Sequence, residues 1–264
     1  MKQPIEYEPL GPEACRLLAL ALADAPETVH AVHTLRRGTC RAYVAGDPAD
    51  FDGAIVQPIH CLAEPTSFGS APDILWDLLQ SVEGWECLLV DSGCASPLGE
   101  LIEKETGLHT RYLDEVCYTL NQPARVFDNE SVRQLSLADL DLLASAPMAL
   151  RAGLWDDLRE LLVKGIVACA VTSDRIVATA LTTAYTDRYA DVGVYTQEGF
   201  RCRGYATAAA SQVAREVQQG GRVPVWGTGE HNLASRRVAE KLGFAQVSRR
   251  RYVILPRNSR TKAR

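Results

Sequence analysis

The stretch at residues 196–207 reads TQEGFRCRGYAT, and the interpretation of the second half of the chain starts from it. An apolar run at 189–196 predicts a strand before it, and an alanine-rich run predicts a helix over 204–218 after it. A short loop of this kind directs successive backbone N–H groups at one point, with the positive end of the helix dipole behind them. This geometry suits a pyrophosphate, because Gly204 and Ala206 allow phosphate to approach the backbone.

The elements around this loop alternate between strand and helix. A tight turn at residues 173–175 predicts a hairpin, and Gly220, Gly221 and Gly243 are typical helix ends. In the second half we predict strands at 132–135, 166–172, 176–183, 189–196, 223–227 and 246–255, and helices from the cap at Ser136 through Ala144 and at 155–163, 204–218 and 233–242.

The first half has a similar order of elements, which favours a duplicated fold. Its turn-rich segment AGDPADFD separates two short strands, and the polar segment at 121–130 is the best linker. We therefore expect domains at 1–127 and 128–256 and a basic tail at 257–264. In the first half we predict helices at 11–23, 26–36, 72–82 and 97–106, and strands at 39–44, 53–58, 86–90 and 110–120.

The loop resembles the phosphate-binding signature of the GNAT N-acyltransferase superfamily, Arg/Gln-x-x-Gly-x-Gly/Ala, and here reads RCRGYA at 201–206. The segment NLASRRVAEKLGF at 232–244 looks like the second signature of that family, an asparagine followed by a helix that ends in Leu-Gly-Phe. The resemblance covers residues 130–255. It implies an α/β (α+β) fold with a GNAT-type mixed, largely antiparallel sheet flanked by helices, in a tandem arrangement with a degenerate N-terminal half.

The resemblance also implies that acetyl-CoA is the acyl donor and that its pantetheine arm lies between splayed strands at 189–196 and 223–227, paired like an extra strand. Each arginine has the alternative role of a solvated surface residue, and Asn232 that of a helix N-cap. The residues assigned to CoA binding are Val194, Tyr195, Thr196, Arg201, Cys202, Arg203, Gly204, Tyr205, Ala206, Thr207, Asn232 and Ser235.

The reaction implied is the direct attack of an amine on the thioester, which needs a proton acceptor and a donor to the oxyanion. Asp191 on the strand and Glu198 in the loop are the candidate bases, and a chain of waters is the alternative. A backbone N–H near Thr196 is the candidate for the oxyanion.

One position departs from the pattern of the family. Many members carry a tyrosine as general acid in the last helix, and the corresponding residue here is Ala239, which has no proton to donate. Ser235 and Tyr195 are the substitutes we consider. The thiolate leaving group has a fairly low pKa and can depart without a positioned acid.

The first half lacks a matching loop. The segment AEPTSFGS at 63–70 has neither a basic residue nor the Gly-x-Ala spacing. We therefore expect this half to bind no CoA and to cap the catalytic half as a wall of the acceptor site.

Composition argues against a nucleic-acid-binding, membrane-spanning or metal-binding protein. The formal charge of −5 argues against nucleic acid as a partner, no apolar run is long enough for a membrane span, and the N-terminus does not resemble a signal peptide, so we expect a cytoplasmic protein. Eight dispersed cysteines predict reduced core residues and no metal site. His30 and His33 lie one turn apart, a spacing more typical of a packed or solvated face than of a metal site.

The sequence therefore favours an acetyl-CoA-dependent N-acetyltransferase that acts on a small primary amine. Two alternatives stay open: a CoA-binding sensor without catalysis, favoured by Ala239, and a protein or peptide N-acetyltransferase. The acceptor, the acyl chain length and the formation of a homodimer are not determined by the sequence.

Overall fold

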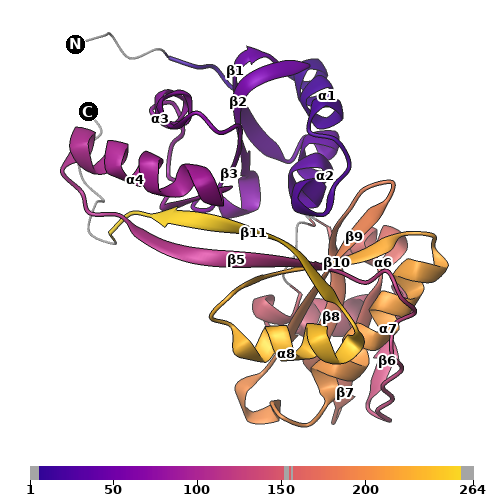
Figure 1. Ribbon diagram of the computed structural model, residues 1–264. Helices are drawn as coiled ribbons and strands as arrows, with labels where there is room; N and C mark the ends of the chain where they lie inside the picture. The colour runs from indigo at the N-terminus through magenta and orange to yellow at the C-terminus, as the bar shows by residue number, and fades with distance from the viewer. Residues whose placement is uncertain (1–5, 152–154, 156, 257–264) are drawn as a thin grey trace. The chain divides into compact units, whose positions relative to one another are not determined.

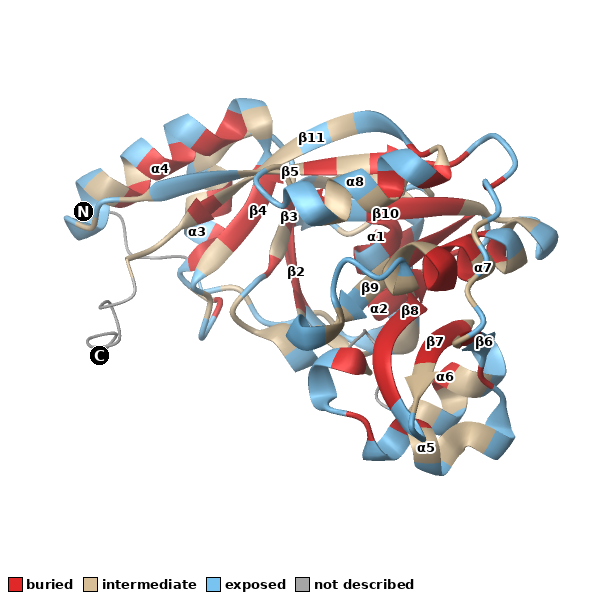
Figure 2. Cartoon of the chain, turned by 90° about the horizontal axis from the view of Figure 1, so that it is seen from below, coloured by how far each residue is buried: buried red, intermediate tan, exposed pale blue. Residues whose placement is uncertain are grey.

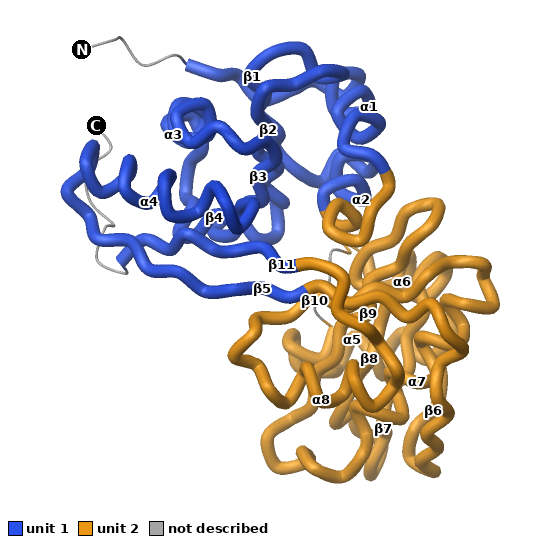
Figure 3. The backbone as a smooth tube through the Cα atoms, in the orientation of Figure 1, with its two compact units in different colours: residues 1–23, 31–116, 249–264 blue, residues 24–30, 117–248 orange. Residues whose placement is uncertain are grey.

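The computed structural model describes residues 6–151, 155 and 157–256, and these form two compact units (Figures 1 and 3). The predicted tail at 257–264 and residue 156 of the predicted helix at 155–163 lie outside the described residues. Unit 1 takes its residues from Met1–Ala23, Ala31–Val116 and Arg249–Arg264, and unit 2 from Asp24–His30 and Cys117–Ser248.

The first half of the sequence forms four α-helices, five strands and two 3-10 turns in its described part. In chain order these are α1 (Pro12–Ala21), η1 (Pro26–Thr28), α2 (Val29–Arg37), β1 (Cys40–Asp47), β2 (Asp50–Pro58), η2 (Ile59–Cys61), β3 (Thr66–Phe68), α3 (Pro72–Leu79), β4 (Cys87–Asp91), α4 (Ser92–Thr106) and β5 (Arg111–Thr119).

The second half contributes the remaining elements. In chain order these are β6 (Val132–Gln134), η3 (Leu137–Asp139), α5 (Leu140–Ser145), η4 (Met148–Leu150), α6 (Leu158–Lys164), β7 (Val167–Thr172), β8 (Arg175–Tyr185), β9 (Tyr189–Thr196), η5 (Glu198–Phe200), α7 (Tyr205–Gln219), β10 (Val223–Gly229), α8 (Leu233–Leu242) and β11 (Ala245–Ile254).

Most predicted elements are confirmed, and the differences have local causes. Helix α4 starts at Ser92 rather than at Pro97, because the Asp91 side chain caps it by accepting a hydrogen bond from the Gly93 amide at 2.8 Å. The segment predicted as a turn between the first two strands is mostly strand, since β1 and β2 pair up to Asp47 and Asp50. The short strand β3 was not predicted, and three residues give too little periodicity to detect it.

In unit 1 the sheet order is β1-β2-β3-β4, then residues 249–254 of β11 and residues 111–116 of β5; in unit 2 it is residues 117–119 of β5, then β10-β9-β8-β7-β6. The pairs β3–β4 and β9–β10 are parallel. The antiparallel pairs are β1–β2, β2–β3, β4–β11, β6–β7, β7–β8 and β8–β9. A mixed, largely antiparallel sheet flanked by helices is therefore confirmed.

Both halves repeat one order of elements: three antiparallel strands, a helix, a parallel strand, a helix and a last strand. The last strands depart from the predicted contiguous domains at 1–127 and 128–256. The end of β11 pairs with β4 from Arg250↔Asp91 to Ile254↔Cys87 and belongs to unit 1, whereas the last residues of β5 belong to unit 2 beside β10 (Figure 3). Each compact unit is thus completed by the final strand of the other half of the sequence.

The core of unit 2 forms where α7 packs on β7, β8 and β9. Its inner face buries Ala208, Ala209, Ala210, Val213, Ala214 and Val217. Much of α7 is accordingly red in Figure 2. Small side chains let the helix lie close to the sheet, which explains the alanine-rich sequence. None of the helices in the described part has the length and apolarity to cross a membrane.

All eight cysteines lie in the described part of the chain and none is in a disulfide there. Cys15, Cys94 and Cys169 are buried, as expected for small core residues. Burial raises the pKa of the Cys169 thiol to about 12 and keeps it neutral.

The basic residues of β11 contact acidic and carbonyl oxygens of unit 1. Arg251 donates through Nε and Nη2 to the two carboxylate oxygens of Asp114 at 2.5 and 3.1 Å, and Arg250 donates to the carbonyl of Ser67. The hydrogen bond from Arg251 lowers the pKa of Asp114 below its ordinary value. This two-point contact joins β5 and β11 by their side chains.

We predict that Asp114→Asn lowers the free energy of unfolding by about 1–3 kcal/mol at neutral pH, because a charged acceptor of two hydrogen bonds is lost. The folded pKa of Asp114 lies below the unfolded value of about 3.9, so its contribution is complete above that pH and is lost as the pH falls through the folded pKa. Urea unfolding at several pH values measures the difference between wild type and variant.

Asp50→Asn, at the exposed end of the β1–β2 hairpin, is the control and is expected to show no such difference. A difference for Asp114→Asn that is as large at about pH 3 as at about pH 7 would contradict the assignment, because below about pH 3.9 the unfolded chain binds a proton at Asp114 and the stabilisation decreases.

Candidate functional site

Strands β9 and β10 pair for only part of their length. Their register ends at Val225↔Asp191, and the described residues beyond it form no further pair between these strands. On its other side β9 stays paired with β8 as far as Ala178↔Thr196. Residues 192–196 therefore have one hydrogen-bonding edge that no strand covers, in agreement with the predicted splay.

The uncovered edge leads directly into the loop before α7. Cys202 and Gly204 have φ angles of 61° and 81°, so the backbone there is left-handed. The first backbone hydrogen bond of α7 is donated by the Ala208 N–H to the Gly204 carbonyl, and no side chain caps the start of the helix. Within the described residues the amides at 205–207 donate no hydrogen bond, and they lie at the positive end of a long helix.

Arg201 and Arg203 stabilise the loop by hydrogen bonds and also give it positive charge. Arg201 Nε donates to the Thr196 carbonyl at 3.4 Å, and Arg203 donates to the Gly199 carbonyl at 3.2 Å while lying over the Phe200 ring. Both guanidinium groups are on exposed residues, so their charge is available to an anion at the loop.

Thr196, the last residue of β9, has a side-chain oxygen without a hydrogen-bond partner among the described residues. This hydroxyl oxygen is buried. A buried hydroxyl without a hydrogen-bond partner costs free energy. The uncovered edge and the helix terminus together fit an extended molecule with amides at one end and phosphates at the other.

The second signature has a structural basis around Trp226. Asn232 caps α8 by accepting a hydrogen bond from the Ser235 amide at 3.2 Å, so its predicted alternative role as an N-cap is confirmed. The Ser235 hydroxyl accepts the Trp226 indole N–H at 2.9 Å. Phe244 packs edge-on against the same indole, after Gly243 ends the helix with a φ angle of 101°.

Ala239 is fully buried within α8 and offers no proton. A tyrosine does contact this helix, but it comes from β5: the Tyr118 hydroxyl accepts a hydrogen bond from Arg236 Nε at 3.0 Å. Sequence reasoning missed Tyr118, because only the sheet order brings β5 next to β10.

Asp191 lies at the point where β9 and β10 separate. Its side chain is 8% exposed, and its Oδ2 lies 3.0 Å from His30 Nε2 and accepts a hydrogen bond from the Thr183 hydroxyl. The register of β8 against β9 is irregular between Thr182 and Ala184, which directs Thr183 at the carboxylate. The sequence singled out Asp191 but missed both partners; His30 entered only through its spacing to His33, which the structure buries.

The other candidates for proton transfer lie elsewhere. Glu198 is exposed in η5, and Tyr195 is 41% exposed at the end of β9. Within the described chain no hydrogen bond links either of them, or Ser235, to Asp191. The structure therefore assembles two groups, Asp191 with His30 and Thr183, and Ser235 with Asn232 and Trp226.

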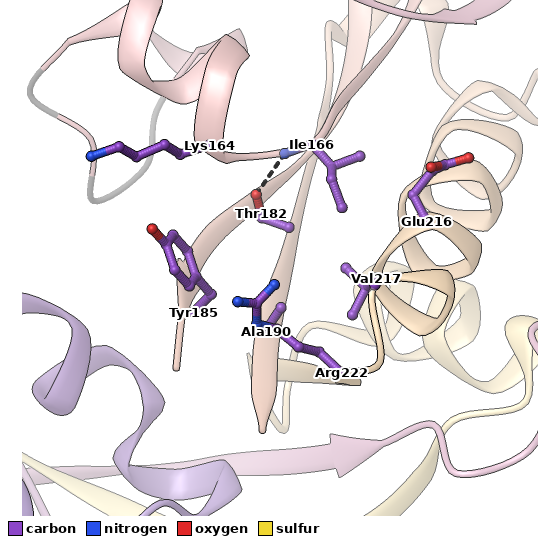
Figure 4. Close-up of a pocket in the computed structure, with 9 residues that line it drawn as sticks. Lys164, Ile166, Thr182, Tyr185, Ala190, Glu216, Val217 and Arg222 are labelled. Atoms are coloured by element: carbon purple, nitrogen blue, oxygen red, sulfur yellow. Dashed lines mark hydrogen bonds between the residues drawn. The ribbon is translucent and has the colours of Figure 1, made fainter. Parts of the chain in front are cut away.

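A small cavity of about 50 Å³ lies on the α7 face of β8 and β9, lined among others by Thr182, Ala190 and Val217 (Figure 4). Adjacent side chains of a strand point to opposite faces, so Asp191 lies on the face turned away from α7. This cavity is therefore separate from the carboxylate and its partners.

Comparison with known protein families matches residues 103–254, more than half of the chain, to the GNAT acetyltransferases. The chain belongs to the GNAT acetyltransferase family. The match includes β5, which the resemblance at 130–255 did not, and the last residues of β5 complete the sheet of unit 2. None of the curated proteins matches the sequence.

Solved structures of GNAT proteins share the fold at low sequence identity. A GCN5-related N-acetyltransferase-like protein from Streptococcus suis has a TM-score of 0.67 at 21% identity, covering 92% of this chain and 99% of its own. A GNAT-family acetyltransferase from Novosphingobium aromaticivorans gives 0.59 at 20%, with 88% and 98% covered. A tandem GNAT protein from the clavulanic acid biosynthesis pathway gives 0.57 at 14%, with 94% and 97% covered.

We predict that Gly204→Val in this GNAT protein raises the Kd for CoA at least about tenfold, because a side chain would stand where the phosphates approach the amides. Isothermal titration calorimetry with CoA measures the effect. The variant is expected to fold, since an added Cβ at Gly204 meets no atom within 4 Å and only the φ of +81° opposes it.

Gly221→Val is the matched control. Gly221 has a φ of +76° and equally open surroundings, but it lies after the other end of α7. Both variants carry the same backbone strain of about 1–2 kcal/mol. Equal CoA affinities for the two variants would remove the phosphate-binding role of the loop.

Proposed function

We propose that this protein is an N-acetyltransferase that transfers an acetyl group from acetyl-CoA to a primary amine on a small molecule. The observation that carries the proposal is the uncovered edge of β9, which runs into a loop of unpaired amides at the start of α7. Membership in the GNAT acetyltransferase family supports an acyl-CoA as the donor.

CoA would be held by two sets of groups. The pyrophosphate would accept hydrogen bonds from the amides of the loop and helix start, with the arginines beside it. The pantetheine amides would pair with the edge of β9 as an added strand and reach the Thr196 hydroxyl. The residues proposed for these contacts are Val194, Tyr195, Thr196, Arg201, Cys202, Arg203, Gly204, Tyr205, Ala206, Thr207, Asn232 and Ser235.

The chemistry is a direct transfer. The amine nitrogen bonds to the thioester carbonyl carbon, the C–S bond breaks, and its electron pair leaves with the sulfur. The protein must hold the two reactants together, donate a backbone N–H of the β9 edge to the oxyanion, and accept a proton from the nitrogen. Ala239 offers no acid for the thiolate, which leaves as a weakly basic group or takes a proton from solvent or the Ser235 hydroxyl.

A CoA-binding sensor is the second candidate, and the buried methyl group of Ala239 is the observation that favours it. The two functions differ in turnover, because both bind CoA and only the enzyme releases CoA thiol in the presence of an acceptor.

We predict that the purified protein binds CoA and releases its thiol from acetyl-CoA when a suitable amine is added. A thiol-reactive dye measures release across a panel of small primary amines, with N-terminal peptides as a separate set. Turnover with peptides alone would replace the small-molecule acceptor by a protein one. Binding of CoA without turnover for any amine would favour the sensor.

Cys202 provides a direct probe of the loop. It is exposed, whereas the other seven cysteines are buried or half-buried. We predict that bound CoA slows alkylation of Cys202 by a maleimide, because the phosphates would lie against the loop. Mass spectrometry of peptides follows the modification, with half-buried Cys61 as the internal control; equal rates with and without saturating CoA would contradict the binding site.

A further inference from the structure

A short piece of the N-terminal sequence belongs to the compact unit that carries the candidate site. Residues 24–30 have the colour of unit 2 in Figure 3. Asp24 accepts hydrogen bonds from the Thr186 hydroxyl at 2.6 Å and from the Arg188 amide at 3.0 Å. Val29 is buried in a cluster with Ala184, Tyr189 and Val225. The start of the segment is thus fixed to the turn between β8 and β9, and its end packs against β8, β9 and β10.

His30 is the last residue of this segment, and it is held against Asp191. The carboxylate is nearly buried and already binds the Thr183 hydroxyl, whereas the imidazole is 47% exposed. His30 and Thr183 both contact Oδ2 of Asp191, so of the two groups the imidazole is the one that an amine can approach. Imidazole is the side chain most often used as a proton acceptor in catalysis, and this one is oriented by the carboxylate.

The pair lies where the reacting end of the donor would be. Asp191 is the last residue of β9 paired with β10, and the uncovered edge extends from there to Thr196. At about 3.3 Å per residue this edge spans roughly 16 Å, a length suited to an extended pantetheine arm. An arm whose phosphates bind at the start of α7 would therefore bring its thioester toward Asp191 and His30.

We propose that His30 is the proton acceptor of the transfer reaction and that Asp191 positions it, an inference that rests on the proposed function. When the neutral imidazole donates its Nε2 hydrogen to Asp191, the second ring nitrogen carries the lone pair. As the amine nitrogen bonds to the carbonyl carbon and the thiolate leaves, the proton of the nitrogen passes to this ring nitrogen. The resulting imidazolium is stabilised by the Asp191 carboxylate and returns the proton to solvent or thiolate.

The test separates basicity from structure with His30→Gln. The glutamine amide nitrogen can take the place of Nε2 and keep the hydrogen bond to Asp191, but it accepts no proton. We expect kcat to fall about 100-fold or more, with the Kd for CoA and the melting temperature unchanged. His109→Ala, a 95% exposed histidine of unit 1, is the control and is expected to keep the wild-type rate.

If His30→Gln does not fold, His30→Ala tests the role of His30 as the proton acceptor. We expect added imidazole to restore part of the rate of His30→Ala and to leave the wild type unchanged, because the free base can replace the missing ring. Rescue should disappear in the double variant with Asp191→Asn, since the carboxylate that orients the imidazole is gone.

The outcomes distinguish this inference from the proposed function. A wild-type rate in His30→Gln, or no rescue of His30→Ala, overturns the role of His30 and leaves the transferase intact. A wild type that binds CoA but transfers to no amine overturns both.

Discussion

The early end of the pairing between β9 and β10 is the constraint on which the candidate site depends. Three register pairs hold these parallel strands together, and β9 then continues with its outer edge uncovered. Backbone amides and carbonyls inside a protein need partners, and parallel strands normally provide them for each other. Here residues 192–196 of β9 lack a partner strand on one edge, and a ligand with amides of its own can pair with that edge.

The remaining parts of the site follow from this parting of strands. The loop after β9 uses left-handed backbone at Cys202 and Gly204 to start α7 with its amides unpaired. On the other side, Trp226 of β10 is fixed by Ser235 and Phe244, which ties the separated strand to α8. Asp191 is the last residue of β9 that pairs with β10, so it lies where the two strands begin to separate. β9 thus carries the carboxylate and the uncovered edge in sequence order and leads into the loop before α7.

Each unit is completed by a strand from the other half of the sequence, so the two halves depend on each other for a complete sheet. β5 and β11 are the last strands of two similar runs of elements, and each ends in the unit that the other run builds. The pairing of β11 with β4 and the contact between Arg251 and Asp114 therefore hold together residues far apart in sequence. Neither half can complete its sheet from its own contiguous residues.

Local chemistry determined what the sequence alone could predict: the loop at 201–206, the alanine face of α7, the Asn232 cap and the Gly243 end all depend on neighbours within a few residues. Local patterns could not predict the features that depend on pairing between residues far apart in the sequence. The exchange of last strands, the contact of Tyr118 with α8 and the pairing of His30 with Asp191 join residues more than a hundred positions apart. A single histidine on a helix carries no periodic signal of its partner, so only the folding of the 24–30 segment onto β8 and β9 could bring that imidazole to the carboxylate.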